Sequence, residues 1–204
     1  MNQLNIFDTN IEEGKLTKIE NGEYIYFPSF FNKSESDGFF ADLKNNIVWK
    51  QESMNMYGKK VNFPRLTAWY GNNDKPYSFS GITLNPLQWT NTLLKIKSQI
   101  ETKADVNFNS VLLNLYRDGN DSISWHTDAE PELGSNPVIA SVNFGATRTF
   151  QLRHIQTKEK IEIELVNGSL LIMQGELQHF WQHQVPKTSK KVNERINLTF
   201  RVIK

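Results

Sequence analysis

Two stretches in the first half of the chain carry apolar residues three or four positions apart, the spacing of an amphipathic helix. Ser34-Glu-Ser-Asp37 resembles a helix-capping box and is followed by Phe39, Phe40, Leu43 and Ile47. The pattern predicts a first helix over about 35–46. Asn85-Pro86 is a plausible cap and first position of a second helix, which would carry Leu87, Leu93, Leu94, Ile96 and Ile100.

After residue 106 the pattern changes to short runs rich in β-branched and aromatic residues, which predict strands. These runs cover 111–117, 138–144, 149–153, 160–166, 169–173 and 195–201, and a shorter run at 24–28 precedes the first helix. Turn residues separate them, at Gly119, Gly145, Asn167-Gly168 and Pro186. Many short strands with regular turns are typical of a sandwich or jelly roll. We therefore predict an α+β fold, a jelly roll with supporting helices packed outside, mainly from the N-terminal half.

The 204 residues, 38% hydrophobic and 22% charged, are typical of one soluble globular domain. Residues 1–22 show no strong period and are interpreted as a loosely attached N-terminal arm, followed by a single domain over 23–204. Within it, the region from Ser53 to Gly81 is interpreted as loops dense in aromatic residues, and 106–204 as the jelly-roll core. We see no 18-residue apolar run and no signal-peptide pattern, so we expect a cytoplasmic monomer without a membrane partner.

The chain has no cysteine, which excludes disulfides, thiolate metal sites and cysteine nucleophiles. A metal would have to be held by His, Asp or Glu, and such ligands favour iron or manganese. The net charge of +1 neither favours nor excludes nucleic acid. Local basic groups do occur, at Lys59-Lys60, Arg65, and Lys187, Lys190 and Lys191, although a solvated surface explains each of them equally well.

A His-x-Asp pair, His126 and Asp128, stands near the middle of the chain. Two side chains at this spacing can point the same way from an extended segment and bind one face of a metal ion. A third ligand could be His183, about 55 residues later, or its rival His179. Two histidines and one carboxylate, with open positions left over, form the facial triad of non-haem iron(II) oxygenases.

The last predicted strand places Arg195, Asn197, Thr199 and Arg201 on one face and apolar residues on the other. Six residues at about 3.3 Å each separate the two arginine Cα atoms by roughly 20 Å, which inward-leaning side chains could narrow to the length of a five-carbon dicarboxylate. Arginine suits bidentate carboxylate binding. Asn114 and Tyr116 share a face of their own strand and could donate to the same acid. The alternatives are a solvated polar face for the last strand and satisfied buried polar groups for these two residues.

Six motifs together resemble one family: Asn114-Leu-Tyr-Arg-Asp-Gly, His126-Thr-Asp, Ser141-Val-Asn-Phe-Gly-Ala, Gly168-Ser-Leu-Leu-Ile-Met, His183-Gln-Val-Pro and Arg195-Ile-Asn-Leu-Thr-Phe-Arg. With them the chain resembles the AlkB-type iron(II)- and 2-oxoglutarate-dependent dioxygenases, most closely the branch that repairs alkylated duplex DNA. The resemblance runs from about residue 55 to the C-terminus and implies a double-stranded β-helix. It favours His183 over His179, because Gln-Val-Pro follows it.

In the family, Fe(II) would be bound by His126, Asp128 and His183. The co-substrate 2-oxoglutarate would be held by Asn114, Tyr116, Arg195, Asn197, Thr199 and Arg201, and O2 would be the second co-substrate. The implied activity is oxidative demethylation of N-alkylated bases in DNA, such as 1-methyladenine and 3-methylcytosine, which reverses the damage and releases formaldehyde. The partner would be alkylated DNA, with RNA as the alternative.

The resemblance also implies that residues 55–81 are nucleotide-recognition loops and that the protein contacts a base flipped out of the duplex. These contacts fall on Met56, Tyr57, Gly58, Tyr77, Phe79, Ala129 and Glu130. Tyr57 would fill the gap left by the base, Phe79 would stack on it opposite His126, and Glu130 would accept from its exocyclic amine. Ordinary hydrophobic packing is the alternative for Tyr57 and Phe79. Ala129 departs from the family, which tends to have a second acidic residue there.

Two alternative hypotheses are also compatible with the sequence. The same chemistry could act on RNA, protein or a small molecule. Alternatively, the chain could be a metal-free jelly-roll binding module whose polar strand faces are merely solvated.

Overall fold

The structure is a computed structural model and describes residues 14–56, 58–72, 77–79, 82–84 and 86–204. Its helices are α1 (Lys33–Asn46), α2 (Asn91–Ala104), the one-turn α3 (Leu177–Phe180) and the 3-10 helix η1 (Pro131–Leu133). Its strands are β1 (Lys15–Ile19), β2 (Gly22–Phe27), β3 (Ser53–Met56), β4 (Lys59–Asn62), β5 (Leu66–Gly71), β6 (Tyr77–Phe79), β7 (Ile82–Leu84), β8 (Ser110–Tyr116), β9 (Ile123–His126), β10 (Ile139–Gly145), β11 (Arg148–His154), β12 (Lys160–Leu165), β13 (Ser169–Gln174), β14 (Trp181–Val185) and β15 (Arg195–Arg201).

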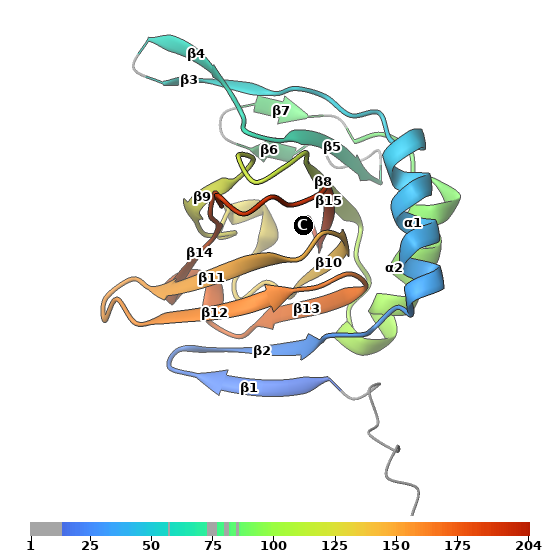
Figure 1. The fold of residues 1–204 in the computed structure, drawn as a ribbon. Helices are drawn as coiled ribbons and strands as arrows, with labels where there is room; N and C mark the ends of the chain where they lie inside the picture. The colour runs from blue at the N-terminus through green and yellow to red at the C-terminus, as the bar shows by residue number, and fades with distance from the viewer. Residues whose placement is uncertain (1–13, 57, 73–76, 80–81, 85) are drawn as a thin grey trace, which may run out of the picture.

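Two antiparallel sheets form the body of the molecule, as the predicted jelly roll requires (Figure 1). The larger sheet has seven strands in the order β1-β2-β13-β10-β15-β8-β5, and the smaller has four in the order β12-β11-β14-β9. Strands β10 and β8 flank β15 in the larger sheet, with Asn197 opposite both Asn143 and Asn114. The last strand of the chain is therefore a central strand, and its inner face looks toward the smaller sheet.

Two apolar layers hold this arrangement. Helices α1 and α2 cover the outer face of the larger sheet (Figure 1), where Leu43, Ile96 and Phe200 are fully buried in one cluster. A second cluster fills the space between the sheets and includes Leu152 and Trp181. The pattern of alternating residues thus gives the larger sheet a helix-facing side and a side that faces the smaller sheet.

Both predicted helices exist, but their N-termini differ from the prediction. The N-cap of α1 is Asn32, whose side chain accepts from the Glu35 backbone N–H, while the Glu35 carboxylate accepts from the Asn32 N–H. This capping box lies two residues before the predicted one at Ser34. Helix α2 is capped by Thr90 rather than begun at Asn85-Pro86, and Asn85 lies outside the described residues.

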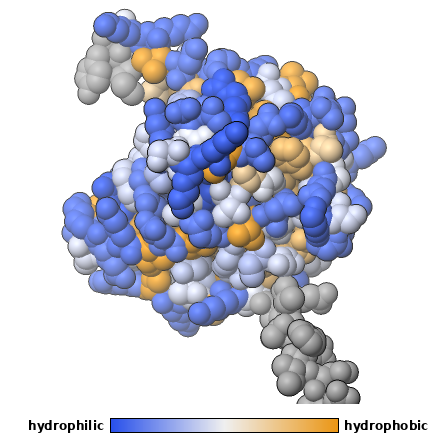
Figure 2. Space-filling view, in the orientation of Figure 1, coloured by the Kyte–Doolittle hydropathy of each residue, from blue (hydrophilic) through white to orange (hydrophobic). Residues whose placement is uncertain are grey.

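The region before the core contains more strand than the sequence indicated. Residues 14–22 were predicted to be part of an arm, but β1 pairs with β2 at the edge of the larger sheet, while residues 1–13 lie outside the described part. The predicted loops from 53 to 81 contain the hairpin β3–β4, the sheet strand β5 and the short strand β6, which pairs with β7 just beyond this region. Figure 2 shows β3–β4 standing out from the body with largely hydrophilic side chains. In the described residues, no helix is long and apolar enough to span a membrane.

Candidate iron and 2-oxoglutarate site

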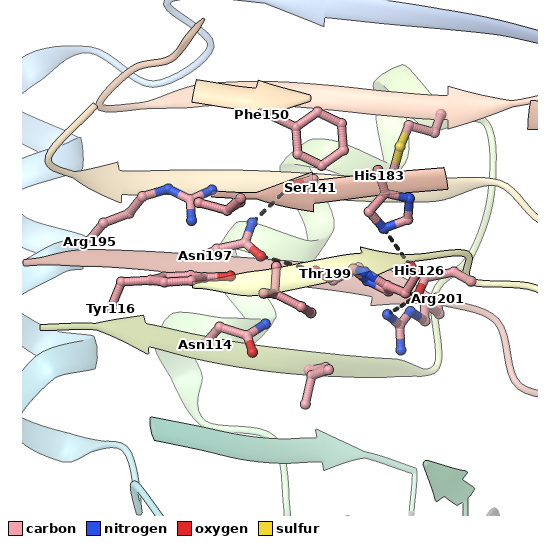
Figure 3. Close-up of a pocket in the computed structure, with 15 residues that line it drawn as sticks. Asn114, Tyr116, His126, Ser141, Phe150, His183, Arg195, Asn197, Thr199 and Arg201 are labelled. Atoms are coloured by element: carbon pink, nitrogen blue, oxygen red, sulfur yellow. Dashed lines mark hydrogen bonds and ion pairs between the residues drawn. The ribbon is translucent and has the colours of Figure 1, made fainter. Parts of the chain in front are cut away.

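The polar face of β15 lines a pocket between the two sheets (Figure 3). Its four polar side chains are only 1% to 9% exposed, so the alternative of a solvated strand face is wrong. The pocket is lined by Leu112, Asn114, Tyr116, Ile123, His126, Asp128, Ser141, Phe150, Met173, His183, Val185, Arg195, Asn197, Thr199 and Arg201. All nine residues predicted to bind iron or 2-oxoglutarate are in this lining.

At one end of the pocket lie the three predicted metal ligands. His126 ends β9, His183 lies opposite it on β14, and Asp128 follows two residues after His126. The Nε2 atoms of the two histidines are each 4.0 Å from a carboxylate oxygen of Asp128. One ligand atom from each residue fits within 4.8 Å of the others, a spacing that a single metal ion can bridge.

The protonation of this cluster suits a divalent cation. Nδ1 of His126 lies 2.8 Å from the Ser124 carbonyl and can donate to it, which leaves the Nε2 lone pair for a metal. Burial, reinforced by the neighbouring His126, lowers the pKa of His183 to about 3, so that this imidazole is neutral at pH 7. Burial alone would raise the pKa of Asp128, but Arg201 and the two histidines more than offset it and hold this carboxyl below its ordinary pKa. The neutral His183 imidazole, the available Nε2 of His126 and the Asp128 carboxylate form a donor set that fits Fe(II).

His179, the rival third ligand, lies elsewhere. It is exposed on α3, and its Nε2 is 3.0 Å from the Asn136 side-chain oxygen. Across the described residues, the group that could hold a metal contains His183 and not His179.

At the other end of the pocket, Arg195 is suited to bind an anion (Figure 3). Arg195 is 1% exposed. Its guanidinium lies 4.9 Å from the centroid of the Tyr116 ring and donates one hydrogen bond to the Asn143 side-chain oxygen. Nε and Nη1 of Arg195 are buried and have no hydrogen-bond partner within the described chain. A buried cation with unused donors is costly unless a ligand supplies acceptors, which a carboxylate of 2-oxoglutarate would do.

Arg201, at the metal end, donates to Oδ1 of Asp128 at 2.8 Å. This bond adds a second role to the predicted one, because the same arginine that would bind the co-substrate also orients the carboxylate of a predicted metal ligand. That both arginines bind 2-oxoglutarate stays a prediction.

The two asparagines of the pocket play different parts. Arg65 Nε donates to Asn114 Oδ1 at 2.7 Å, so the amide nitrogen of Asn114 is the group left for the pocket. In contrast, the Asn197 amide nitrogen already donates to Ser141 Oγ at 2.8 Å, and its oxygen accepts from Thr199. We therefore interpret Asn114 as a donor to the co-substrate. Asn197 instead links strands β15 and β10 in the pocket wall.

Three residues that support the site were not predicted as site residues. Arg65, interpreted from sequence as one of several basic groups, is 4% exposed and not a surface cation. Asn143 accepts from Arg195, and Gln178 accepts from the Asp128 backbone N–H at 2.9 Å. Asn143 at least lies within a motif that carried the resemblance, whereas Gln178 has no signal in the sequence.

The predicted base contacts lie mostly beyond what the structure describes. Tyr57 and the side chains of Met56, Tyr77 and Phe79 are outside the described residues. Gly58 follows Tyr57 at the end of the β3–β4 hairpin with φ of 76°, a left-handed conformation that favours glycine.

The two remaining predicted base contacts differ in their surroundings. Ala129 is exposed, and its side chain offers no polar group to a base. Glu130 has one buried carboxylate oxygen without a hydrogen-bond partner among the described residues.

Comparison with known proteins agrees with this geometry. The family model of the 2OG-Fe(II) oxygenase superfamily matches residues 23–201. The chain is 44% identical to alpha-ketoglutarate-dependent dioxygenase alkB homolog 3 of Bos taurus over 186 residues, which cover 86% of this chain and 64% of that protein. It therefore spans less than two thirds of that relative.

Two further matches involve other members of the group. DNA oxidative demethylase ALKBH2 of Homo sapiens is 36% identical over 184 residues, which cover 85% of this chain and 70% of that protein. The solved structure of OsALKBH1 has a TM-score of 0.63 at 17% identity, covering 91% of this chain and all of that one. At that identity the second match supports the fold alone.

Proposed function

This chain belongs to the 2OG-Fe(II) oxygenase superfamily, and from that premise we propose that it removes methyl groups oxidatively from alkylated DNA bases. That membership supports an activity that depends on iron(II) and 2-oxoglutarate, and the three residues that could hold a metal support it too. The observation that carries the proposal is one pocket with three candidate iron ligands at one end and an arginine with unused donors at the other. The chain is also 36% identical to a DNA oxidative demethylase.

The chemistry divides between the cofactor and the protein. Bound iron with 2-oxoglutarate and O2 would supply the oxidation, in which 2-oxoglutarate becomes succinate and CO2 while an N-methyl group becomes N-hydroxymethyl, which leaves as formaldehyde. The residues of this chain bind and orient. His126, Asp128 and His183 would hold the metal, and Arg195 and Asn114 would bind the diacid at the far end. Phe150 and Met173 line the same pocket with apolar surface that limits access of water.

The proposed substrate is a methylated base that carries positive charge, such as 1-methyladenine or 3-methylcytosine. Methylation at these positions blocks base pairing, so the base can be flipped out at a reduced cost. The unpartnered carboxylate oxygen of Glu130, two residues beyond Asp128, would accept from the exocyclic amine of such a base. The exposed Lys59 and Lys60 on the protruding hairpin β3–β4 would contact DNA phosphates. Phosphate contacts supply most of the affinity for nucleic acid.

A panel of substrates tests the proposal. The protein is supplied with Fe(II) and 2-oxoglutarate and given 1-methyladenine in duplex DNA, in single-stranded DNA and in RNA, with unmethylated strands as controls. We expect formaldehyde and succinate in equal amounts from methylated DNA. Release from RNA alone would assign the activity to RNA, and 2-oxoglutarate turnover without formaldehyde from any strand would contradict the proposal.

A further inference from the structure

The backbone of the metal ligand Asp128 lies outside the sheets. Residues 127–130 have no regular structure and connect β9 to η1, yet Asp128 is only 1% exposed. A buried N–H that no strand takes up needs another acceptor. Gln178, fifty residues further along the chain and also 1% exposed, provides it, because its Oε1 accepts from the Asp128 N–H at 2.9 Å.

The bond to Gln178 complements the one made by Arg201. Arg201 Nη2 donates to the carboxylate of Asp128 at 2.8 Å and thereby orients the side chain. Gln178 fixes the backbone from which that side chain projects. Without its acceptor, the Asp128 N–H would be a buried donor with no partner, and the loop could relieve this only by moving.

The one-turn helix α3, which carries Gln178, is tied to its neighbours. The Phe180 carbonyl at its end accepts from the Ile155 N–H at 2.7 Å. The indole Nε1 of Trp181 donates to the Glu20 carbonyl at 2.7 Å in the turn between β1 and β2. A Cβ added at Gly22 would lie 3.0 Å from the Leu177 backbone, so the β1–β2 hairpin packs directly against the start of α3.

We propose that Gln178 is a positioning residue for the iron ligand Asp128. Five residues after it on the same segment comes His183, so residues 178–183 supply one ligand and set the place of another. The β1–β2 hairpin supports both from outside. This inference rests on the iron site of the proposed function and not on the nature of the nucleic acid.

The test compares substitutions that separate the acceptor from the bulk of the side chain. Gln178→Met keeps an unbranched chain of similar volume and removes the acceptor. Gln178→Glu restores an acceptor oxygen at the same reach. The matched control is His179→Ala, on the same short helix but exposed. Binding of Mn(II), used as a redox-stable probe of the iron site, is titrated in the presence of 2-oxoglutarate, and thermal unfolding is recorded on the metal-free proteins.

We expect Gln178→Met to weaken Mn(II) binding about 10- to 100-fold, as changes behind metal ligands typically do. Gln178→Glu should recover most of that loss, and His179→Ala should match the wild type. Wild-type affinity in Gln178→Met, or an equal loss in Gln178→Glu, would overturn the inference. If Gln178→Met does not fold, Gln178→Ala takes its place with the same expectations. Since no nucleic acid is present, failure to demethylate any oligonucleotide would contradict the proposed function while leaving this result intact.

Discussion

Replacing Arg65 with methionine tests whether a buried cation behind the pocket controls the affinity for 2-oxoglutarate. Arg65 does not line the pocket, but its Nε donates to Asn114 Oδ1 at 2.7 Å and its Nη1 to the Ser122 carbonyl at 3.3 Å. Burial lowers its pKa, so the fold retains this cation at a cost. We interpret Arg65 as the group that holds the Asn114 side-chain oxygen and so points the amide nitrogen of Asn114 toward the co-substrate.

The size of the effect follows from the hydrogen bonds. In Arg65→Met, Asn114 Oδ1 would be a buried acceptor without a donor, and the amide could relieve this by turning its nitrogen away from the pocket. The 2-oxoglutarate carboxylate would then face an oxygen and lose a hydrogen bond to a charged group, which contributes about 1.5–3 kcal/mol. A tenfold change in Kd is about 1.4 kcal/mol, so we expect 2-oxoglutarate to bind about ten- to a hundredfold more weakly.

Calorimetric titration of 2-oxoglutarate into the Mn(II)-loaded protein measures this directly. The control is Lys50→Met. Lys50 is an exposed cation near Arg65, since its backbone pairs with Thr67 of β5, so its replacement reports the loss of charge alone. A Kd for Arg65→Met within twofold of the wild type, or an equal weakening in Lys50→Met, would refute the reasoning.

Three further predictions concern affinity, pH and folding. Arg195→Met should weaken 2-oxoglutarate binding at least about tenfold by calorimetry, because its unused donors are lost, and leave Mn(II) affinity without 2-oxoglutarate unchanged; a loss of both would contradict the assignment. Burial lowers the pKa of His183 to about 3 in the metal-free folded chain. Between pH 6.5 and 3 this histidine is therefore protonated in the unfolded chain and neutral in the folded one. Urea unfolding in chelator should therefore show stability falling by about 1.4 kcal/mol per pH unit below pH 6.5, more steeply than in His183→Gln, and parallel slopes would count against it. Asn32→Ala should cost about 1 kcal/mol in the same assay and Ser34→Ala much less, whereas the reverse order would place the cap of α1 at Ser34.

The central strand β15 and the candidate metal ligands His126 and Asp128 could be predicted because the relevant information is local. Alternation along β15 separates Arg195 and Arg201 from the apolar face, and the structure buries the two faces in different layers. The His-x-Asp spacing likewise pointed to two candidate ligands within three residues, and the structure places both in a group that could hold a metal. Helix ends were less certain, since both Asn32 and Ser34 have an acidic residue three positions later and the period cannot choose between them.

The missed features depend on contacts between distant parts of the chain. Strand β14 alternates buried and intermediate residues, but its polar composition of Gln and His hides the pattern. Arg65 reaches Asn114 across 49 positions and Gln178 reaches Asp128 across 50. No propensity or period reports such a pair, because each residue is unremarkable in its own segment and acquires its role only when the sheets close.

Mass spectrometry of a 1-methyladenine oligodeoxynucleotide, incubated with the protein, Fe(II), 2-oxoglutarate and air, tests the central claim most directly. Wild-type protein and His179→Ala should both convert the strand to the mass of the unmethylated sequence, and His183→Ala should leave it unchanged. An unchanged mass with wild-type protein, or conversion that persists in His183→Ala, would contradict the assignment of this pocket as the demethylation site.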